Sequence, residues 1–296
     1  MEKTVTFNHN DKRLFGILHL PDDSPAERLV MMVIGGAQTR IASHRMYVQL
    51  ARYLCDNGVA VFRFDYEGLG DSEGDFVGFE YAGPSICSAI DFAFNEFPGL
   101  KRFIVWSLCD GAAASMINLP PEQHRITAMI LANPFLESDT GTAHTIIKHY
   151  YVKRLWDREF WQKVLSFRLN IGESIRSFFG LVRTSVSKDS KGGWLDTGMS
   201  MPQCVLQGLH SFHKPIHFLI SSDDMQGLEF YDLIQKDNES RARIKNGLFS
   251  IRFIKGGDHT FTDPQVKHHA FRESLNAINN VAPMPVPEPV PSSVII

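Results

Sequence analysis

One tight turn constrains what this chain can fold into. The stretch 103–106 is apolar and aromatic, and it is followed by small Ser107, by Cys109 and by Gly111. Good helix formers continue from Ala112. This order predicts a buried strand, a turn of very few residues and then a helix. Small residues two positions before and two positions after Cys109 suit such a turn, because the strand and helix backbones nearly touch there.

The residue at the apex of this turn is a cysteine. Its S-x-C-x-G pattern has the layout of the G-x-S-x-G turn, which exposes a nucleophile above a sheet. We expect Cys109 to precede a helix that begins near Asp110, where the helix dipole favours the thiolate, the reactive form of the side chain. A buried structural cysteine is the alternative, since cysteines outside disulfides are often buried. The turn alone leaves both interpretations open.

Composition and charge narrow the class of protein. At 296 residues, with 44% hydrophobic residues, the chain can bury a full core, and a net charge of −3 gives no reason to expect nucleic-acid binding. The cysteines (Cys55, Cys87, Cys109 and Cys204) show neither metal-ligand spacing nor a dense disulfide framework. We therefore expect a cytoplasmic protein without a metal site. The N-terminus lacks an apolar signal region, and no apolar run approaches the ~20 residues of a membrane span.

Buried strands and helices alternate along the chain. Apolar or alternating runs predict strands at 3–8, 13–20, 28–34, 59–64, 101–106, 126–132, 215–221 and 249–254. Helical patterns predict helices at 44–57, 79–97, 110–119, 226–238 and 264–279. This alternation predicts an α/β fold with a doubly wound, mostly parallel sheet. The glycine-rich stretch 65–74 lacks the Lys-Ser/Thr pair of a phosphate loop, and we expect no cofactor.

Two segments depart from the alternation. Residues 135–210 are rich in aromatic and basic residues, and we expect an inserted helical cap that shapes a pocket and excludes water. Prolines at alternate positions from 283 to 291 predict a flexible tail over 282–296. The core is therefore expected to consist of residues 1–134 and 211–281.

Three groups of chemically reactive side chains each follow a predicted strand. They are Cys109, the adjacent Asp223 and Asp224, and His259. Reactive residues of open α/β sheets gather beyond the carboxyl ends of the strands, so we expect these groups to meet. His259 would accept the thiol proton of Cys109, and a carboxylate would hold the imidazole in the required tautomer. Taken singly, adjacent aspartates often cap a helix, and a histidine in a glycine-rich loop often lies on the surface.

Backbone N–H groups near this turn could hold the oxyanion of a tetrahedral intermediate. The residue after the apex, Asp110, provides one such group. The loop Gly35-Gly36-Ala37 follows a buried strand, and Ala37 is the expected second donor. A plain tight turn is the alternative explanation of the glycine pair. His44 follows this loop closely and is a further candidate for the pocket.

These motifs together resemble the α/β-hydrolase superfamily over roughly residues 1–280. The stretches Gly35-Gly36-Ala37-Gln38-Thr39-Arg40, Asp65-Tyr66-Glu67-Gly68-Leu69-Gly70-Asp71-Ser72, Leu108-Cys109-Asp110-Gly111 and Asp258-His259-Thr260-Phe261 look like those of the exosortase A system-associated hydrolases, type 1. Those bacterial proteins are encoded beside exopolysaccharide and protein-sorting genes. The resemblance implies Cys109 as nucleophile, His259 as base and Asp224 as acid, with Asp223 as the fallback. The sequence departs from the usual superfamily pattern at Ser107, where glycine is common, and at Cys109, where serine is common.

The sequence therefore predicts an α/β hydrolase that cleaves an ester or thioester through an acyl-thioenzyme. Its substrate would be a small or carrier-linked acyl compound, and the resemblance implies a connection with exopolysaccharide acylation. Two alternatives stay open. One is an acyltransferase that uses the same acyl-enzyme with an alcohol or amine acceptor. The other is a catalytically silent hydrolase fold that acts as an accessory binding protein. The oligomeric state is left undetermined.

Overall fold

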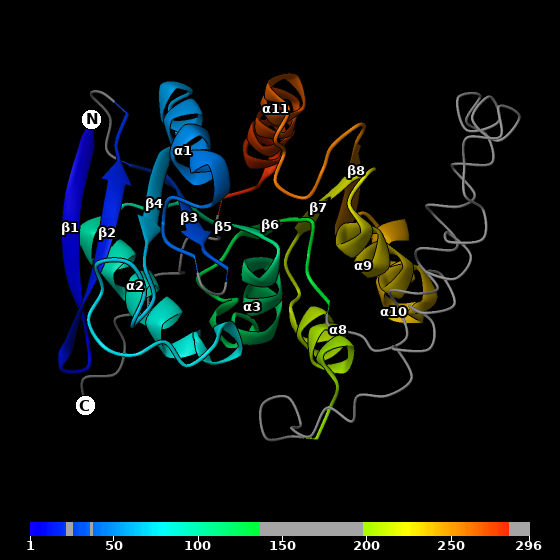
Figure 1. The fold of residues 1–296 in the computed structure, drawn as a ribbon, viewed down its shortest axis with the longest axis horizontal. Helices are drawn as coiled ribbons and strands as arrows, with labels where there is room; N and C mark the ends of the chain where they lie inside the picture. The colour runs from blue at the N-terminus through cyan, green and yellow to red at the C-terminus, as the bar shows by residue number, and fades with distance from the viewer. Residues whose placement is uncertain (22–25, 36–37, 137–197, 284–296) are drawn as a thin grey trace, which may run out of the picture.

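The computed structural model describes residues 1–21, 26–35, 38–136 and 198–283. They contain an eight-stranded sheet in the order β1-β2-β4-β3-β5-β6-β7-β8 (Figure 1). The strands are β1 (Glu2–His9), β2 (Lys12–His19), β3 (Arg28–Val33), β4 (Ala60–Phe64), β5 (Arg102–Leu108), β6 (Ala128–Ala132), β7 (Ile216–Ser221) and β8 (Phe249–Ile254). The helices are α1 (Met46–Asp56), α2 (Gly83–Glu96), α3 (Asp110–Asn118), α8 (Met201–Ser211), α9 (Met225–Lys236), α10 (Asn238–Lys245) and α11 (Pro264–Asn280), with 3-10 turns η1 (Ser43–Arg45), η2 (Phe79–Tyr81) and η3 (Pro120–Glu122).

The sheet is mostly parallel, as the alternation of strands and helices predicts. β2 pairs antiparallel with both β1 and β4, and the remaining pairs from β4 to β8 are parallel. Strands β3 to β6 are buried on both faces, which explains their mainly apolar sequences, interrupted within β4 by the buried Arg63. The parallel arrangement brings the carboxyl ends of β3, β5, β6, β7 and β8 to the same edge of the sheet.

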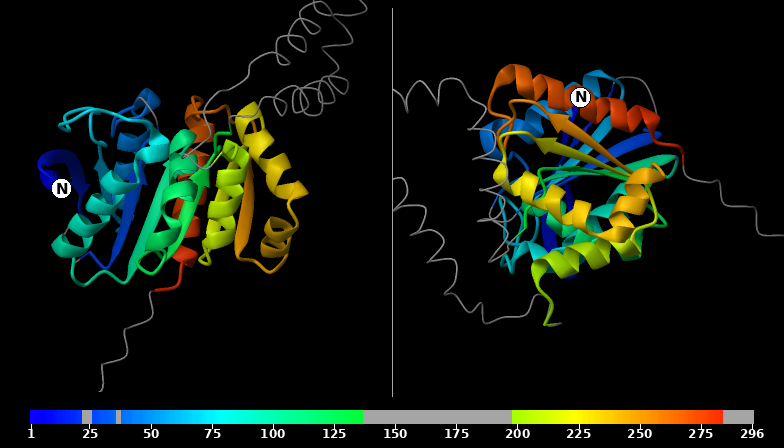
Figure 2. Two further views of the ribbon diagram at one scale, coloured as in Figure 1. Left: turned by 90° about the horizontal axis from the view of Figure 1, so that it is seen from below. Right: turned by 90° about the vertical axis from the view of Figure 1, so that its right-hand side faces the viewer.

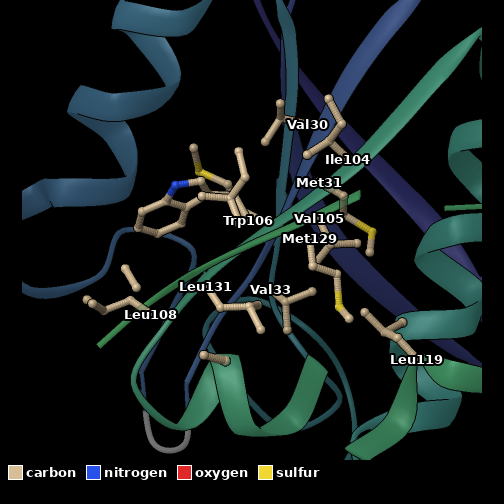
Figure 3. Packing of buried hydrophobic residues seen from close by; sticks show 14 of the residues in the cluster. Val30, Met31, Val33, Ile104, Val105, Trp106, Leu108, Leu119, Met129 and Leu131 are labelled. Atoms are coloured by element: carbon tan, nitrogen blue, oxygen red, sulfur yellow. The ribbon is translucent and has the colours of Figure 1, made fainter. Parts of the chain in front are cut away.

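Helices cover both faces of the sheet. Helices α1 and α11 contact each other on one face, and α2, α3 and α8 lie on the other (Figure 2). Trp106 of β5 lies among the buried apolar side chains of the central strands (Figure 3). Its ring packs edge-on against Tyr47 of α1, and its indole N–H donates to Ser274 Oγ of α11 at 3.0 Å. One strand residue therefore ties both helices of that face to the centre of the sheet. Within the described ranges, none of the helices is long and apolar enough to cross a bilayer.

Some helix boundaries differ from those that the sequence predicts. The predicted helix 44–57 begins as η1, where His44 has a φ of 53°, and the α-helix starts at Met46. The predicted helix 226–238 ends early because Asp237 is extended and its carboxylate accepts a hydrogen bond from the Ser240 N–H at 2.7 Å. That contact begins α10, a helix missing from the sequence prediction. Its mean hydropathy is very low, so it carries little of the apolar periodicity on which the prediction rests.

The predicted cap and tail fall largely outside the described residues, which exclude 137–197 and 284–296. The end of the segment expected as a cap forms α8, which packs closely on α3 of the core. A Cβ atom added at Gly208 would lie 1.9 Å from the Met116 carbonyl oxygen, so only glycine allows this approach of the two helices. The interpretation of the remaining segment as a cap, and of the C-terminus as a flexible tail, stays a prediction.

Candidate active site

The predicted turn at Cys109 is present between β5 and α3. Cys109 has a φ of 61° and a ψ of −128°, a backbone conformation that costs a residue with a side chain about 1–3 kcal/mol. Backbone hydrogen bonds on both sides hold it there. The Cys109 N–H donates to the Ala132 carbonyl at 3.0 Å, and the Cys109 carbonyl accepts from the Ala112 N–H at 3.0 Å. The strain is therefore compensated by β6 on one side and by the first turn of α3 on the other.

Glycines at the turn allow α3 to approach the end of β3. A Cβ atom on Gly111 would lie 2.7 Å from the Val33 carbonyl oxygen. On the opposite side, a Cβ atom on Gly35 would lie 1.8 Å from Asp110 Oδ1. Gly111 is thus required by the contact between α3 and the end of β3, while Ser107 faces α3 as expected, with its hydroxyl 3.0 Å from Ser115 Oγ. This packing brings the loop after β3 beside the Cys109 turn.

Asp224 is the aspartate that contacts His259. It caps the N-terminus of α9, and its carboxylate accepts from the Gly227 N–H at 3.0 Å and from the Gln226 N–H at 3.3 Å. His259 Nδ1 lies 2.9 Å from Asp224 Oδ2. Asp224 is 6% exposed, whereas the neighbouring Asp223 is exposed and its carboxylate accepts from Ser222 Oγ at 3.0 Å. Of the two adjacent aspartates, Asp224 is therefore the one placed to orient the His259 imidazole, and its role as the acid stays a prediction.

His259 lies in the loop after β8 and interacts with both Asp224 and Cys109. Burial lowers the pKa of His259, but hydrogen bonds to Asp224 and Cys109 and the negative charges of both raise it to about 10. Because Nδ1 faces the carboxylate, Nε2 is the ring nitrogen left for the thiol. The three residues predicted from separate strand ends are thus brought together at one edge of the sheet.

The predicted oxyanion donors are only partly described. Asp110 is the first residue of α3, where helix N–H groups point outward from the helix end. Gly36 and Ala37 lie outside the described residues, so the proposed second donor stays a prediction. The segment before them is anchored, because Tyr66 Oη donates to the Ile34 carbonyl at 2.7 Å. His44 is exposed in η1.

An ion pair anchors the chain on the far side of the same loop. The Asp65 side chain is fully buried, and it pairs with the Arg40 guanidinium and accepts the Arg40 N–H at 2.6 Å. Burial raises the pKa of Asp65, and its contacts with Arg40 oppose that rise. Arg63 of β4 donates to the Arg40 carbonyl at 2.6 Å. The residues just after the expected oxyanion donor are therefore fixed to β4.

Asn133 was not singled out by the sequence analysis, although it holds two parts of the site together. It follows β6, is fully buried and has a φ of 40°. Its carboxamide accepts from the Ser221 N–H at 2.7 Å and donates to the His259 carbonyl at 2.9 Å. It also donates to Ser221 Oγ at 2.9 Å. An Asn-Pro pair after a buried strand was the available signal, since asparagine tolerates left-handed backbone at turns.

Gln226 is a second residue that the sequence analysis did not assign. Its side-chain oxygen lies 4.0 Å from Cys109 Sγ. Gln226 is in the first turn of α9, directly beyond the cap residue Asp224. The cap that orients the acid therefore also places a neutral amide beside the thiol.

No cluster of His, Cys, Asp or Glu side chains suited to holding a metal ion occurs among the residues that the structure describes. The polar groups near Cys109 are the imidazole of His259, the carboxylate of Asp224 behind it, and the amide of Gln226. Such a set can deprotonate a thiol, deliver it to a carbonyl carbon and protonate a leaving group.

Comparisons with known proteins agree with this architecture. The family described as serine aminopeptidase, S33, matches residues 25–166. No curated protein sequence matches this chain at a significant level. An esterase from Pyrococcus furiosus has 17% sequence identity and a TM-score of 0.63, covering 95% of this chain and 92% of its own.

Two further solved structures are similar in fold. A dienelactone hydrolase from Anabaena variabilis has 11% identity and a TM-score of 0.61, with 95% of this chain and 98% of that chain covered. Est1E from Butyrivibrio proteoclasticus, solved with ferulic acid bound, has 15% identity and a TM-score of 0.52, with 93% and 96% covered. Together with the strand order and the strained turn at Cys109, these similarities establish that the chain has the α/β-hydrolase fold.

Proposed function

We propose that this protein is a hydrolase that cleaves an ester or thioester, with Cys109 as nucleophile, His259 as general acid–base and Asp224 as the orienting carboxylate. The observation that carries the proposal is the position of His259, whose Nδ1 is hydrogen-bonded to Asp224 and whose pKa is raised by both Asp224 and the nearby Cys109. The acid, the base and the thiol come from three different loops at one edge of the sheet, so local sequence alone does not account for their meeting.

The chemistry divides into two half-reactions. His259 takes the Cys109 proton, and the thiolate attacks the substrate carbonyl carbon to form a C–S bond and an oxyanion. Collapse of this intermediate breaks the bond to the leaving oxygen or sulfur, which takes the proton from His259. Water then attacks the acyl-thioenzyme while His259 accepts a water proton. Release of the acid returns that proton to Cys109.

The raised pKa of His259 favours an imidazolium at neutral pH. A neighbouring imidazolium is one of the groups that activate a cysteine nucleophile in proteins. The matched family is described by its serine chemistry, so the cysteine at the apex is the point at which this chain departs from it. A thiol at this place suits the substrates of thioesterase-like and dienelactone-hydrolase-like enzymes.

The substrate class is proposed from the fold neighbours and from sequence resemblance. The similar structures include esterases, one of them with ferulic acid bound, and a dienelactone hydrolase. Resemblance to the exosortase-associated hydrolases supports a role in adding or removing acyl groups on exopolysaccharide or its carrier-linked precursors. An ester or thioester of an acyl group is common to all of these.

The test is the rate at which iodoacetamide alkylates Cys109 as a function of pH. Peptide mapping separates Cys109 from Cys87, whose pKa is raised by burial and by the charge of Glu122, so Cys87 serves as an internal control. We expect the Cys109 rate to reach its plateau well below the ~8.5 of an ordinary thiol. His259→Ala should abolish that early plateau.

The same preparation should hydrolyse p-nitrophenyl esters or acyl-thioesters, and Cys109→Ser should change that activity. A Cys109 rate that rises through the ordinary thiol pKa and ignores His259 would refute the proposal and favour the accessory binding protein. Cys109 acylation with turnover only when an alcohol or amine is supplied would favour the acyltransferase.

A further inference from the structure

The Tyr47 hydroxyl bridges the ends of β3 and β5, the strand that leads into the Cys109 turn. It donates to the Val33 carbonyl at 3.0 Å, and it accepts from the Leu108 N–H at 3.2 Å. Val33 is the last residue of β3, and Leu108 is the last residue of β5. Tyr47 itself is 1% exposed, and its ring packs edge-on against Trp106 at 5.4 Å.

The bridge lies where the two strands send the chain to opposite faces of the sheet. β3 and β5 are parallel neighbours whose pairing ends at Val33 and Ser107. Beyond that point β3 leads to α1 on one face, while β5 leads to α3 on the other (Figure 1). Strands that diverge in this way open a crevice in which ligands of α/β proteins bind. The hydroxyl sits between the diverging ends and satisfies one backbone group on each.

Both anchored groups are close in sequence to the residues of the proposed reaction. Leu108 immediately precedes Cys109, and Val33 lies just before the loop Gly35-Gly36-Ala37. Burial raises the pKa of Tyr47, and the charges of Asp110 and Cys109 raise it further, so the hydroxyl stays neutral. A neutral hydroxyl can donate to one strand and accept from the other, which neither a phenolate nor a phenylalanine can do.

We infer that Tyr47 is a positioning residue that fixes the Cys109 turn, and with it the Asp110 N–H as oxyanion donor, relative to the end of β3. This inference rests on the proposed function, because it assigns Tyr47 a role in that reaction. The hydroxyl does not contact the substrate. It acts through the two strand ends, and loss of the bridge would let the Cys109 turn and the end of β3 move apart.

The variant Tyr47→Phe removes the bridge and keeps the ring against Trp106. With a p-nitrophenyl ester that the wild type hydrolyses, we expect kcat to fall about tenfold or more, because a misaligned oxyanion donor loses part of the 10²–10³ that such a donor supplies. KM should change less than twofold.

Thr127→Val is the matched control. Thr127 Oγ1 donates to the Phe103 carbonyl at 2.8 Å, so this variant also deletes a buried hydroxyl from a bond to β5, but near the opposite end of the strand. We expect its thermal midpoint to fall while kcat stays at the wild-type value. A loss of kcat in Thr127→Val equal to that in Tyr47→Phe would overturn the inference, because it would follow from stability alone.

Hydrogen exchange tests the bridge itself without requiring turnover. The Leu108 amide should exchange only through large-scale unfolding in the wild type, and in Tyr47→Phe it should exchange much faster than the loss of global stability accounts for. In Thr127→Val its exchange should rise only in proportion to the loss of global stability. Rapid exchange of Leu108 in the wild type would overturn the bridge even if Tyr47→Phe does not fold.

Faster exchange of Leu108 in Tyr47→Phe with unchanged kcat would overturn the positioning role and leave the proposed function intact. A wild type without His259-dependent reactivity would refute the proposed function, and the positioning role with it, whatever the exchange shows.

Discussion

His259 Nδ1 lies 2.9 Å from Asp224 Oδ2, across the ends of the neighbouring parallel strands β7 and β8. The contact joins two residues that are separated by helices α9 and α10 in the sequence. Register explains how they meet, since Ser221 at the end of β7 is paired with Ile254 at the end of β8. The next few residues of each strand therefore leave the sheet side by side.

Replacement of Asp224 by asparagine should impair the reaction without unfolding the protein. In Asp224→Asn the single carboxamide oxygen would keep one of the two cap hydrogen bonds of α9, but the negative charge would be lost and the imidazole could adopt the wrong tautomer. We expect kcat on an ester to fall by about 10²–10⁴, by analogy with other acid–histidine pairs. Asp223→Asn is the matched control and should leave kcat within about twofold of the wild type. A larger loss in Asp223→Asn than in Asp224→Asn would show that Asp223 is the acid.

The raised pKa of His259 predicts a specific dependence of stability on pH. The folded-state pKa of about 10 exceeds the ~6.5 of an unfolded chain, so the charged ring stabilises the fold fully below that lower value. The contribution is lost as the pH rises toward 10. Urea unfolding of the wild type and of His259→Gln should therefore differ most near pH 6 and converge near pH 10. A difference that grows over this interval would show that His259 is neutral in the folded protein.

Removal of the Asn133 carboxamide should loosen the His259 loop. Asn133→Gly keeps a residue suited to a φ of 40° while deleting the hydrogen bonds to Ser221 and to the His259 carbonyl. We expect a loss of about 2–4 kcal/mol in the free energy of unfolding, at roughly 1 kcal/mol for each bond and more for a buried group left unpaired. The kcat should fall about tenfold.

Ser221→Ala provides the comparison for Asn133→Gly, because it removes only the Ser221 hydroxyl and retains the contact of Asn133 with His259. It should cost less stability, and kcat should stay near the wild-type value. Denaturant unfolding and steady-state kinetics on the same preparations measure both quantities. Equal losses of kcat in the two variants would show that the contact between Asn133 and His259 is not what supports activity.

A negative charge at position 226 should disfavour ionisation of the Cys109 thiol. The side-chain oxygen of Gln226 lies 4.0 Å from Cys109 Sγ, so Gln226→Glu would place a carboxylate beside the nucleophile. Like charges disfavour ionisation, and the pH at which iodoacetamide alkylation is half-maximal should rise by about one unit or more. Gln226→Met, which keeps the length of the side chain without a charge, should shift it less. An unchanged profile in Gln226→Glu would mean that this side chain points away from the thiol in solution.

Sequence patterns were sufficient for most of the elements and for the order of the reactive groups. Strands β3 to β6 have mainly apolar sequences because they are buried on both faces, and the turn at Cys109 has a recognisable spacing of small residues. Helix α10 was missed because its sequence is almost wholly polar. It is held by a cap at Asp237 and by Arg243, which donates to the carbonyls of Leu209 and Phe212 near the end of α8.

The sequence by itself determined the α/β class, the strained turn that carries Cys109, and the candidate residues at the strand ends, because burial and backbone geometry impose local patterns on the chain. Only the tertiary structure decided that Asp224 and not Asp223 contacts His259, that Asn133 joins the ends of β6 and β7 to the His259 loop, and that Tyr47 bridges β3 and β5. Each of these contacts joins residues distant in the sequence. They depend on strand register and on the direction in which a side chain leaves the backbone, and neither quantity has a local pattern.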